Sequence, residues 1–310
     1  MINHMPPKRF MLLLCIMIPL SSVGQLAPLS DQYMLNPVTI NPAYAGNRGV
    51  FNISAFYRQQ WVGITGAPET ATLAGDVALL NSKVGLGFIV SNDRIGVTKK
   101  TSANSNYSFR INFGGGILSF GLGAGLITTN TAWSELVIVD PGDDNLLVDS
   151  KVFVVPDFSF GLYYTNLKYF AGLSIPRLLL YNFSPEKNKY ILKSDPEQYY
   201  YLLNSGGVFD VAPKTKFLPS TLLSFSPGEK LLYDINAHFS FSDRLWLGAS
   251  YGNNRSVKGF VQFQANDQLR VAYTYNYGYG KLRTFIDGSH EIMFRYEFRY
   301  KADAINPLIF

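Results

Sequence analysis

The sequence has very few of the residues that build disulfide frameworks or metal centres. Among its 310 residues there are one cysteine, Cys15, and three histidines. A disulfide needs two cysteines, and zinc needs three or four converging protein ligands, so we expect neither feature. The glycine-rich stretches 114–116 and 121–125 lack the Lys-Ser/Thr pair and the following helix pattern of a phosphate-binding loop. We therefore predict no metal and no cofactor.

Charged residues are scarce as well. They make up 16% of the chain, with 27 Lys and Arg against 22 Asp and Glu, and the basic residues form no extended run. Binding to nucleic acid needs a concentrated basic surface, so the sequence indicates no nucleic-acid partner. The hydrophobic fraction of 47% excludes a disordered chain.

Long hydrophobic runs are missing apart from one short stretch near the start. Residues 10–20 are apolar, but a membrane-spanning helix needs roughly 20 such residues. Two basic residues precede this stretch, and small residues follow it up to Gly24. This order is typical of a secretory signal peptide, so we expect residues 1–24 to be removed and the mature chain to lack cysteine.

Aromatic residues and glycine are abundant instead. There are 23 Phe, 20 Tyr and 27 Gly, a composition that favours strands and tight turns over helices. Within 50–60, apolar Phe51 and Ile53 alternate with polar Asn52 and Ser54. The same alternation recurs in 105–113, 231–240, 269–277 and 290–300. Strands of about ten residues with one apolar face are typical of transmembrane barrels, although a soluble sandwich also shows such alternation.

Fourteen segments fit a strand pattern. They are 50–60, 69–79, 83–92, 101–113, 117–128, 156–164, 168–176, 199–209, 216–226, 231–240, 245–251, 257–265, 269–277 and 290–300. Outer-membrane barrels of bacteria have an even number of antiparallel strands. The sequence therefore predicts an all-β fold, a transmembrane antiparallel β-barrel of the outer-membrane type with about 14 strands over residues 50–300.

The lengths of the connections favour the barrel over the sandwich. Every second connection is short, apart from the somewhat longer 210–215, whereas the other set includes the long stretches 129–155, 177–198 and 278–289. Outer-membrane barrels have short periplasmic turns and longer extracellular loops. We therefore predict an integral outer-membrane protein with its long loops on the cell surface. Both termini, including a tail at 301–310, would then lie in the periplasm.

The polar faces of the predicted strands carry charges of both signs. Mixed charge on the inner face of a barrel indicates a salt-bridged or water-filled lumen. The candidate lumen network consists of Arg58, Arg110, Asp234, His238, Arg270 and Arg295. The alternating glycines in 121–125 would leave room inside the barrel or permit a bend in the strand.

Residues 25–49 lack the alternation and form a separate N-terminal periplasmic segment in our prediction. The pairs Asn36-Pro37 and Asn41-Pro42 fix local turns, because proline restricts its own backbone and that of the residue before it. The segment is either a linker before the first strand or a structured extension that plugs the barrel mouth or binds machinery. Candidate partner-binding residues here are Asn36, Pro37, Asn41, Pro42 and Tyr44.

The loop 129–155 is the candidate contact surface on the opposite side. Its candidate partner-binding residues are Trp133, Asp140, Asp143 and Asp144. Together with Asp149, these carboxylates have the oxygen ligands that Ca²⁺ prefers, but their spacing does not match an EF-hand. A solvated acidic loop is the simpler interpretation of the same residues.

Several short motifs also resemble those of a known family. In chain order they are DQYMLNP (31–37), INPAYAG (40–46), YRQQW (57–61), PDFSFG (156–161), AGLS (171–174), LWLG (245–248), GSHEIMFRY (288–296) and NPLIF (306–310). Each motif is short, but their number and order are specific and cover nearly the whole mature chain. The sequence resembles the PorP/SprF family of membrane proteins associated with type IX secretion and gliding.

This resemblance implies an integral outer-membrane component that supports export and surface attachment of specific client proteins such as adhesins. The implied partners are outer-membrane lipid, other type IX secretion components and a large secreted surface protein. Two alternatives from other classes are a passive porin-like channel and a lipid hydrolase. A hydrolase needs a Ser–His pair, but Ser289 and His290 are neighbours in a strand and point to opposite faces. We therefore expect no enzymatic activity.

Overall fold

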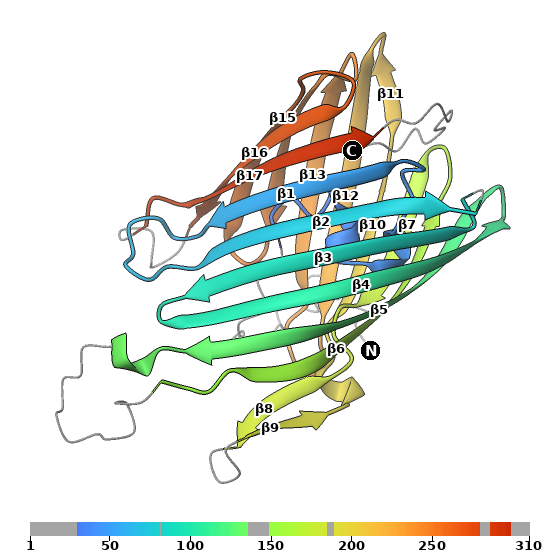
Figure 1. The fold of residues 1–310 in the computed structure, drawn as a ribbon. Coiled ribbons are helices and arrows are strands. Elements are labelled where there is room, and N and C mark those ends of the chain that lie inside the picture. Colours follow the sequence, from blue (N-terminus) through green and yellow to red (C-terminus); the bar gives the residue numbers. More distant parts are fainter. Residues whose placement is uncertain (1–29, 81, 136–148, 185–188, 280–285, 299–310) are drawn as a thin grey trace, which may run out of the picture.

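The structure is a computed structural model of the chain. It describes residues 30–80, 82–135, 149–184, 189–279 and 286–298. Figure 1 shows long, tilted strands that lie side by side and form a curved wall. The helices in the described part are single turns of three residues, and none of them is long and apolar enough to cross a membrane.

Fifteen strands in the described residues belong to one antiparallel sheet. Their bounds are β1 (Phe51–Gln59), β2 (Glu69–Leu79), β3 (Val84–Ile95), β4 (Thr98–Phe113), β5 (Gly116–Thr131), β6 (Phe153–Thr165), β7 (Tyr169–Ile175), β10 (Tyr201–Gly207), β11 (Phe209–Ala212), β12 (Thr215–Phe225), β13 (Leu232–Phe241), β14 (Leu245–Gly252), β15 (Ser256–Gln264), β16 (Leu269–Gly278) and β17 (Ser289–Phe298).

The sheet closes on itself. β1 pairs with β2 on one side and with β17 on the other, so the first and last strands meet. β10 joins β7 to β12, and β11 continues along β12 after a one-residue break. Because β10 and β11 together make one strand of the wall, the fold is a closed antiparallel barrel of 14 strands. The predicted fold class is confirmed.

Side chains alternate between the two faces of the wall, as the sequence pattern predicts. In β1, Asn52 and Ser54 are fully buried, whereas Tyr57 is 46% exposed on the outer face. Phe109 in β4 and Tyr273 in β16 are exposed in the same way. The outer face therefore presents apolar and aromatic side chains, which is the pattern of a barrel surrounded by lipid.

The two rims of the barrel differ in their connections. On the rim that we call the short-connection rim, no loop exceeds four residues: 80–83, 114–115, 166–168, 213–214, 242–244 and 265–268. The other rim, the long-connection rim, contains the stretches after β5, β7 and β16, although 96–97 and 253–255 are also short. Every second connection is therefore short, as predicted, and the three long connections lie on the other rim.

The β3–β4 connection is shorter than predicted. We expected strands at 83–92 and 101–113, but β3 continues to Ile95 and β4 begins at Thr98. Gly96 has a φ of +57° and makes the two-residue turn between them. Most side chains between the two predicted strands are polar or charged, so this hairpin has no apolar face that alternation could reveal.

A small second sheet was not predicted. β8 (Leu180–Ser184) pairs with β9 (Lys189–Lys193) inside the long connection between β7 and β10. Figure 1 shows this hairpin extending beyond the barrel wall. Two single-turn helices, η3 (Trp133–Glu135) and η5 (Pro196–Gln198), also lie in the long connections.

Candidate functional site: a chain segment inside the barrel

Residues 30–49, which we call the lumen segment, lie inside the barrel (Figure 1). Every residue from 31 to 48 except Thr39 is buried. The segment forms two single turns, η1 (Pro37–Thr39) and η2 (Pro42–Tyr44), and each begins with the proline of an Asn-Pro pair. The side chain of Asn41 caps η2 by accepting a hydrogen bond of 3.0 Å from the Ala43 amide. The described part of the segment is therefore a structured filling of the lumen, and the linker interpretation is wrong for it.

The lumen segment crosses the barrel from one rim towards the other. Asp31 contacts Arg58, which is the last but one residue of β1 before the long-connection rim. At the other end of the segment, the Gly46 amide donates to Asp76 near the end of β2, close to the short-connection rim. Ser30 therefore lies in the half of the lumen that faces the long connections.

Glycines in the wall make room for the lumen segment. A Cβ atom added at Gly121 in β5 would overlap the backbone of Ala43, and one added at Gly85 in β3 would overlap the carbonyl of Ala45. At Gly161 in β6, the added atom would overlap the side chain of Asn41. The interpretation that alternating glycines leave space inside the barrel is confirmed at Gly121, and the space is filled by the chain itself.

Hydrogen bonds fix the same part of the segment to the wall. Asn41 Nδ2 donates to the carbonyl oxygens of Leu162 and Leu173, at 2.9 and 3.3 Å. Ser174 Oγ donates to the Ile40 carbonyl, and Ser108 Oγ donates to the Ala45 carbonyl, both at 2.7 Å. These residues come from β4, β6 and β7, so three strands hold residues 40–45 in one register.

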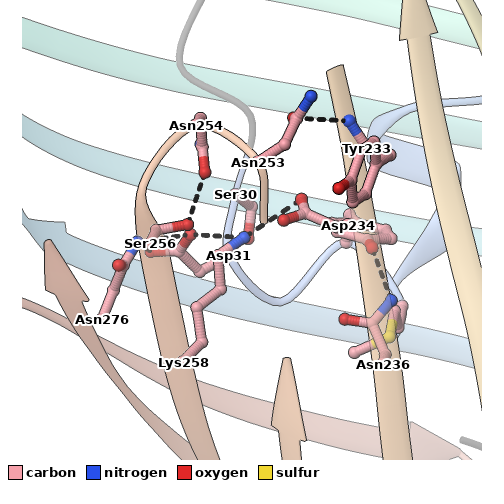
Figure 2. A network of polar contacts seen from close by, with 12 residues as sticks. Ser30, Asp31, Tyr233, Asp234, Asn236, Asn253, Asn254, Ser256, Lys258 and Asn276 are labelled. Atoms are coloured by element: carbon pink, nitrogen blue, oxygen red, sulfur yellow. Dashed lines mark hydrogen bonds and ion pairs between the residues drawn. The ribbon is translucent and has the colours of Figure 1, made fainter. Parts of the chain in front are cut away.

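A charged network holds the beginning of the segment. Asp31 lies 3.0 Å from Arg58 and 3.2 Å from Lys258, and Lys258 lies 3.2 Å from Asp234. The backbone amide of Asp31 donates to Glu291 at 2.8 Å. Figure 2 shows Asp31 between the wall residues that surround it, with Lys258 on β15 and Asp234 on β13. Five charged side chains from four strands and the lumen segment therefore meet at one level of the lumen.

The ionisation of Asp31 reflects this environment. Burial alone would raise the pKa of its carboxyl group, because a charged group loses solvation inside the protein. The guanidinium of Arg58 and the ammonium of Lys258 outweigh that effect, and the pKa of Asp31 lies below its ordinary value. Asp31 is therefore an anion that the wall stabilises in place.

A second charged group holds the end of the segment. Arg48 lies 3.4 Å from Glu297 in β17 and also donates to the Leu35 carbonyl at 2.9 Å. Arg295, which is fully buried, donates to the same carbonyl. Arg48 thus ties the end of the lumen segment to Leu35 and to the wall.

The six predicted lumen residues all have their side chains on the inner face, but they do not form one network. Arg58 and Asp234 belong to the group around Asp31, whereas Arg295 belongs to the group around Arg48. Arg110 donates to the Val84 carbonyl at 3.4 Å.

The remaining two predicted lumen residues lie apart from both charged groups. Arg270 stacks over Trp246 at 4.2 Å and donates to Gln264 at 2.6 Å. His238 packs against the ring of Phe260, and neither of its ring nitrogens has a hydrogen-bond partner in the described residues. The membership of His238 in a lumen hydrogen-bond network stays a prediction.

The predicted partner-binding residues fall into two groups. Asn36, Pro37, Asn41, Pro42 and Tyr44 are all buried in the lumen and lie on no outer surface. Trp133 is 36% exposed near the long-connection rim, whereas Asp140, Asp143 and Asp144 lie outside the described residues. Contact of any of these residues with a partner protein stays a prediction.

Asp31 and Arg48 are the functional residues that the sequence analysis missed. Both sit in a stretch without periodicity, so nothing in the sequence pattern indicates which wall residues they contact.

The described residues contain no group of three His, Cys, Asp or Glu side chains arranged to hold a metal ion. Asp149 accepts hydrogen bonds from the backbone and hydroxyl of Ser134, which ties it to the neighbouring loop.

Several solved structures are partly similar to this chain in shape. The outer membrane protein Omp33 of Acinetobacter baumannii is 8% identical, with a TM-score of 0.49, and the match covers 81% of this chain and 98% of that chain. The monoaromatic hydrocarbon channel CymD is 13% identical, with a TM-score of 0.49 and coverages of 90% and 96%. The toluene transporter TodX of Pseudomonas putida is 11% identical, with a TM-score of 0.46 and coverages of 90% and 96%.

Comparison of the sequence with known families identifies the family of this chain. No curated protein sequence matches the chain. The family described as Type IX secretion system membrane protein PorP/SprF matches residues 22–296, which is most of the chain. The match includes the lumen segment as well as nearly all of the wall. The chain therefore belongs to the PorP/SprF family of type IX secretion system membrane proteins.

Proposed function

We propose that this protein is an outer-membrane accessory that supports export and surface attachment of specific client proteins, such as adhesins. The observation that carries the proposal is the filled lumen. A protein with a general transport role needs an open path, whereas an accessory that holds partners needs a rigid wall and an accessible rim. The lumen segment occupies the space that an open path would need and is bonded to the wall, as we expect of an accessory that holds partners.

The filled lumen disfavours the alternative function, a passive porin-like channel. A barrel of 14 strands is wider than the roughly 8-stranded barrels that side chains alone can fill. Here the additional space is occupied by residues 31–48, and almost all of them are buried. Water and small solutes would have to pass a segment that is fixed to β4, β6 and β7 by hydrogen bonds.

The long-connection rim is where we propose that a client makes contact. Besides the exposed Trp133, it carries a cleft of about 380 Å³ lined by Arg177, Tyr181, Tyr200 and Glu229, among others. Arg177 is held in this cleft by Asp157, at 3.4 Å, and lies over the Tyr181 ring. Aromatic and arginine side chains in a concave site are typical anchors of specific protein interfaces.

The orientation in the membrane follows from the two rims. We propose that the short-connection rim faces the periplasm, as in other outer-membrane barrels. β17 ends at Phe298 on that rim, which supports a periplasmic C-terminus. We likewise propose that other type IX secretion components contact this side, and that outer-membrane lipid surrounds the aromatic outer face. A periplasmic N-terminus stays a prediction, because the described chain begins inside the lumen.

The lipid hydrolase alternative gains no support from the geometry. Ser289 Oγ accepts a hydrogen bond from the Trp61 amide at 3.1 Å, and His290 Nδ1 lies 2.6 Å from the hydroxyl of Tyr273. The two side chains point to opposite faces of β17, so they cannot form a nucleophile–base pair. We propose a protein without enzymatic activity.

Surface proteomics of a deletion strain tests the proposed function. We expect the strain to lose one or a few specific exported proteins from its surface, while uptake of small hydrophilic solutes stays unchanged. Re-expression of the full chain should restore the display of the same proteins. If no exported protein is lost and solute uptake falls, the accessory function is wrong and the channel function replaces it.

A further inference from the structure

The two ends of the lumen segment are held by different kinds of contact. Residues 40–48, which we call the seated half, pack directly on wall glycines such as Gly121 and bond through the backbone of Ile40 and Ala45. Residues 30–34, which we call the strap, are held mainly through side chains. Asp31 contributes ion pairs with Arg58 and Lys258, and Tyr33 accepts a hydrogen bond of 2.8 Å from Asn236.

The wall around the strap keeps its charges paired when the strap is absent. Removing one partner of a buried ion pair is normally costly, because it leaves an uncompensated charge inside the protein. Here Lys258 lies 3.2 Å from Asp234, and Arg58 lies 3.8 Å from Glu291, independently of Asp31. Departure of Asp31 therefore leaves each of the two cations beside a carboxylate of the wall.

The apolar contacts also divide near the same point. Tyr33 and Met34 pack in a cluster with Leu202, Leu222 and Phe260, which Ile40 of the seated half completes. Leu35 belongs to a different cluster, which contains much of the remaining lumen segment. The carbonyl of Leu35 is held by Arg48 and Arg295. The segment is thus anchored firmly from Leu35 onwards.

The lumen has free space beside the strap. A cavity of about 130 Å³ lies against Ser30 and is lined by Arg58 and Glu291, together with polar residues of β2 and β3 such as Thr70 and Asp93. Ile40, Phe56 and Ile89 also line this cavity, and its polar side suits water, which can solvate the charged wall as the strap moves. The cavity lies in the half of the lumen that faces the long connections.

We propose that the strap is a releasable closure of this half of the lumen, with Leu35 as its hinge. It leaves towards the long-connection rim while the seated half stays in its glycine-lined place. Release exposes Tyr33 and Met34 to water, so the released state is rare in the isolated protein. A partner surface that accepts these two apolar side chains favours release. The proposal rests on the proposed function only for the identity of that partner.

Alkylation of single cysteines tests the closure. In the full chain with Cys15→Ser, we compare Met34→Cys in the strap with Val38→Cys in η1, since both side chains are almost completely buried. Purified barrels in detergent are exposed to a soluble maleimide. We expect Met34→Cys to react about tenfold faster than Val38→Cys, because local opening exposes only the strap. Adding Asp31→Asn should accelerate the reaction at position 34 by about another tenfold and leave the reaction at position 38 unchanged.

Asp76→Asn is the matched control for the charge change. Asp76 faces the seated half, where it accepts from the Gly46 amide, so its substitution should not accelerate alkylation at position 34. The heat-induced shift of folded barrels on gels confirms that each variant has assembled. Equal rates at positions 34 and 38 in folded protein would overturn the closure, and so would equal acceleration by the two Asn variants. If Asp31→Asn does not assemble, the comparison of positions 34 and 38 in the parent decides alone. The assay contains no client, so its failure is distinct from failure of the proposed function.

Discussion

The barrel wall and the lumen segment reach their structures by opposite routes. Each wall strand bonds to its neighbours through the backbone, and the alternation of its side chains repeats every two residues. The lumen segment has no repeating pattern, and its partners lie far away in sequence, as with Asp31 and Glu291, which are 260 residues apart. Each wall strand is therefore specified by its own alternating sequence, whereas the filling of the lumen depends on the closed barrel around it.

The outer and inner faces of the wall differ in the residues that they can accept. The outer face has large apolar side chains such as Phe109 and Tyr273, which need only a lipid environment. The inner face combines fully buried polar residues with glycines where the lumen segment approaches most closely. An outer position therefore tolerates many apolar residues, but an inner position must fit one particular segment.

Arg48→Met should have the largest effect on stability. The substitution removes the cation that lies 3.4 Å from the buried Glu297 carboxylate, and it removes a donor to the Leu35 carbonyl. Breaking a buried pair in this way costs about 3–5 kcal/mol. The measurement is the free energy of unfolding in urea for the barrel in lipid vesicles. Glu297→Gln in the same chain should recover part of the loss, and a single variant as stable as the parent would contradict the fit of the lumen segment.

Phe109→Lys tests the outer face. A lysine at mid-bilayer on the lipid side of a barrel costs about 2–4 kcal/mol, so we expect reduced stability and less assembled protein. Phe109→Leu keeps the position apolar and is the matched control. Assembly is measured by the heat-induced gel shift. Equal damage by the lysine and leucine variants would show that Phe109 does not face lipid.

Gly121→Ala tests the space that the inner face leaves for the lumen segment. The new methyl group would overlap the Ala43 backbone, and overpacking of this kind costs about 1–3 kcal/mol. Gly259→Ala is the control, because nothing lies within 4 Å of a Cβ atom at that position. Limited proteolysis should cut residues 30–49 faster in the first variant only. The same cleavage rate in both variants would mean that the segment is not fixed by this contact.

Epitope tags should have the smallest effect on stability, because they lie in connections outside the wall. Tags near Asp144 or Lys187 should be accessible to antibody on intact cells, whereas tags at Gly115 or Asp267 should be accessible only after lysis. All four insertions should leave the barrel assembled. Labelling in the reverse order would show that the short-connection rim faces outwards.

Much of the wall could be predicted from the sequence. Segment 69–79 matches β2 residue for residue, and 245–251 differs from β14 at one end only, because alternation directly reports a wall with one apolar face. The polar hairpin around Gly96 and the small sheet of β8 and β9 were missed, since neither has such a face in contact with lipid.

The contacts of the lumen segment could not be predicted in the same way. Asn41 was selected as unusual, but its partners are carbonyl groups of Leu162 and Leu173, which no side-chain pattern reveals. Alternation predicted that the Arg58 side chain points into the lumen. Its ion pair with Asp31, however, depends on the path of residues 30–49 through the closed barrel. The lack of alternation and the two Asn-Pro pairs marked the segment as distinct, and plugging of the barrel mouth was one of the interpretations that the sequence left open.

Single-channel recording of the purified protein in planar bilayers tests most directly whether the lumen is closed. The parent chain should show no conductance steps of the size of an open barrel. A variant without residues 30–46, once shown by the gel shift to have assembled, should show such steps, because the filling has been removed. Steady porin-like conductance from the parent itself would contradict the closed lumen and, with it, the accessory function that we propose.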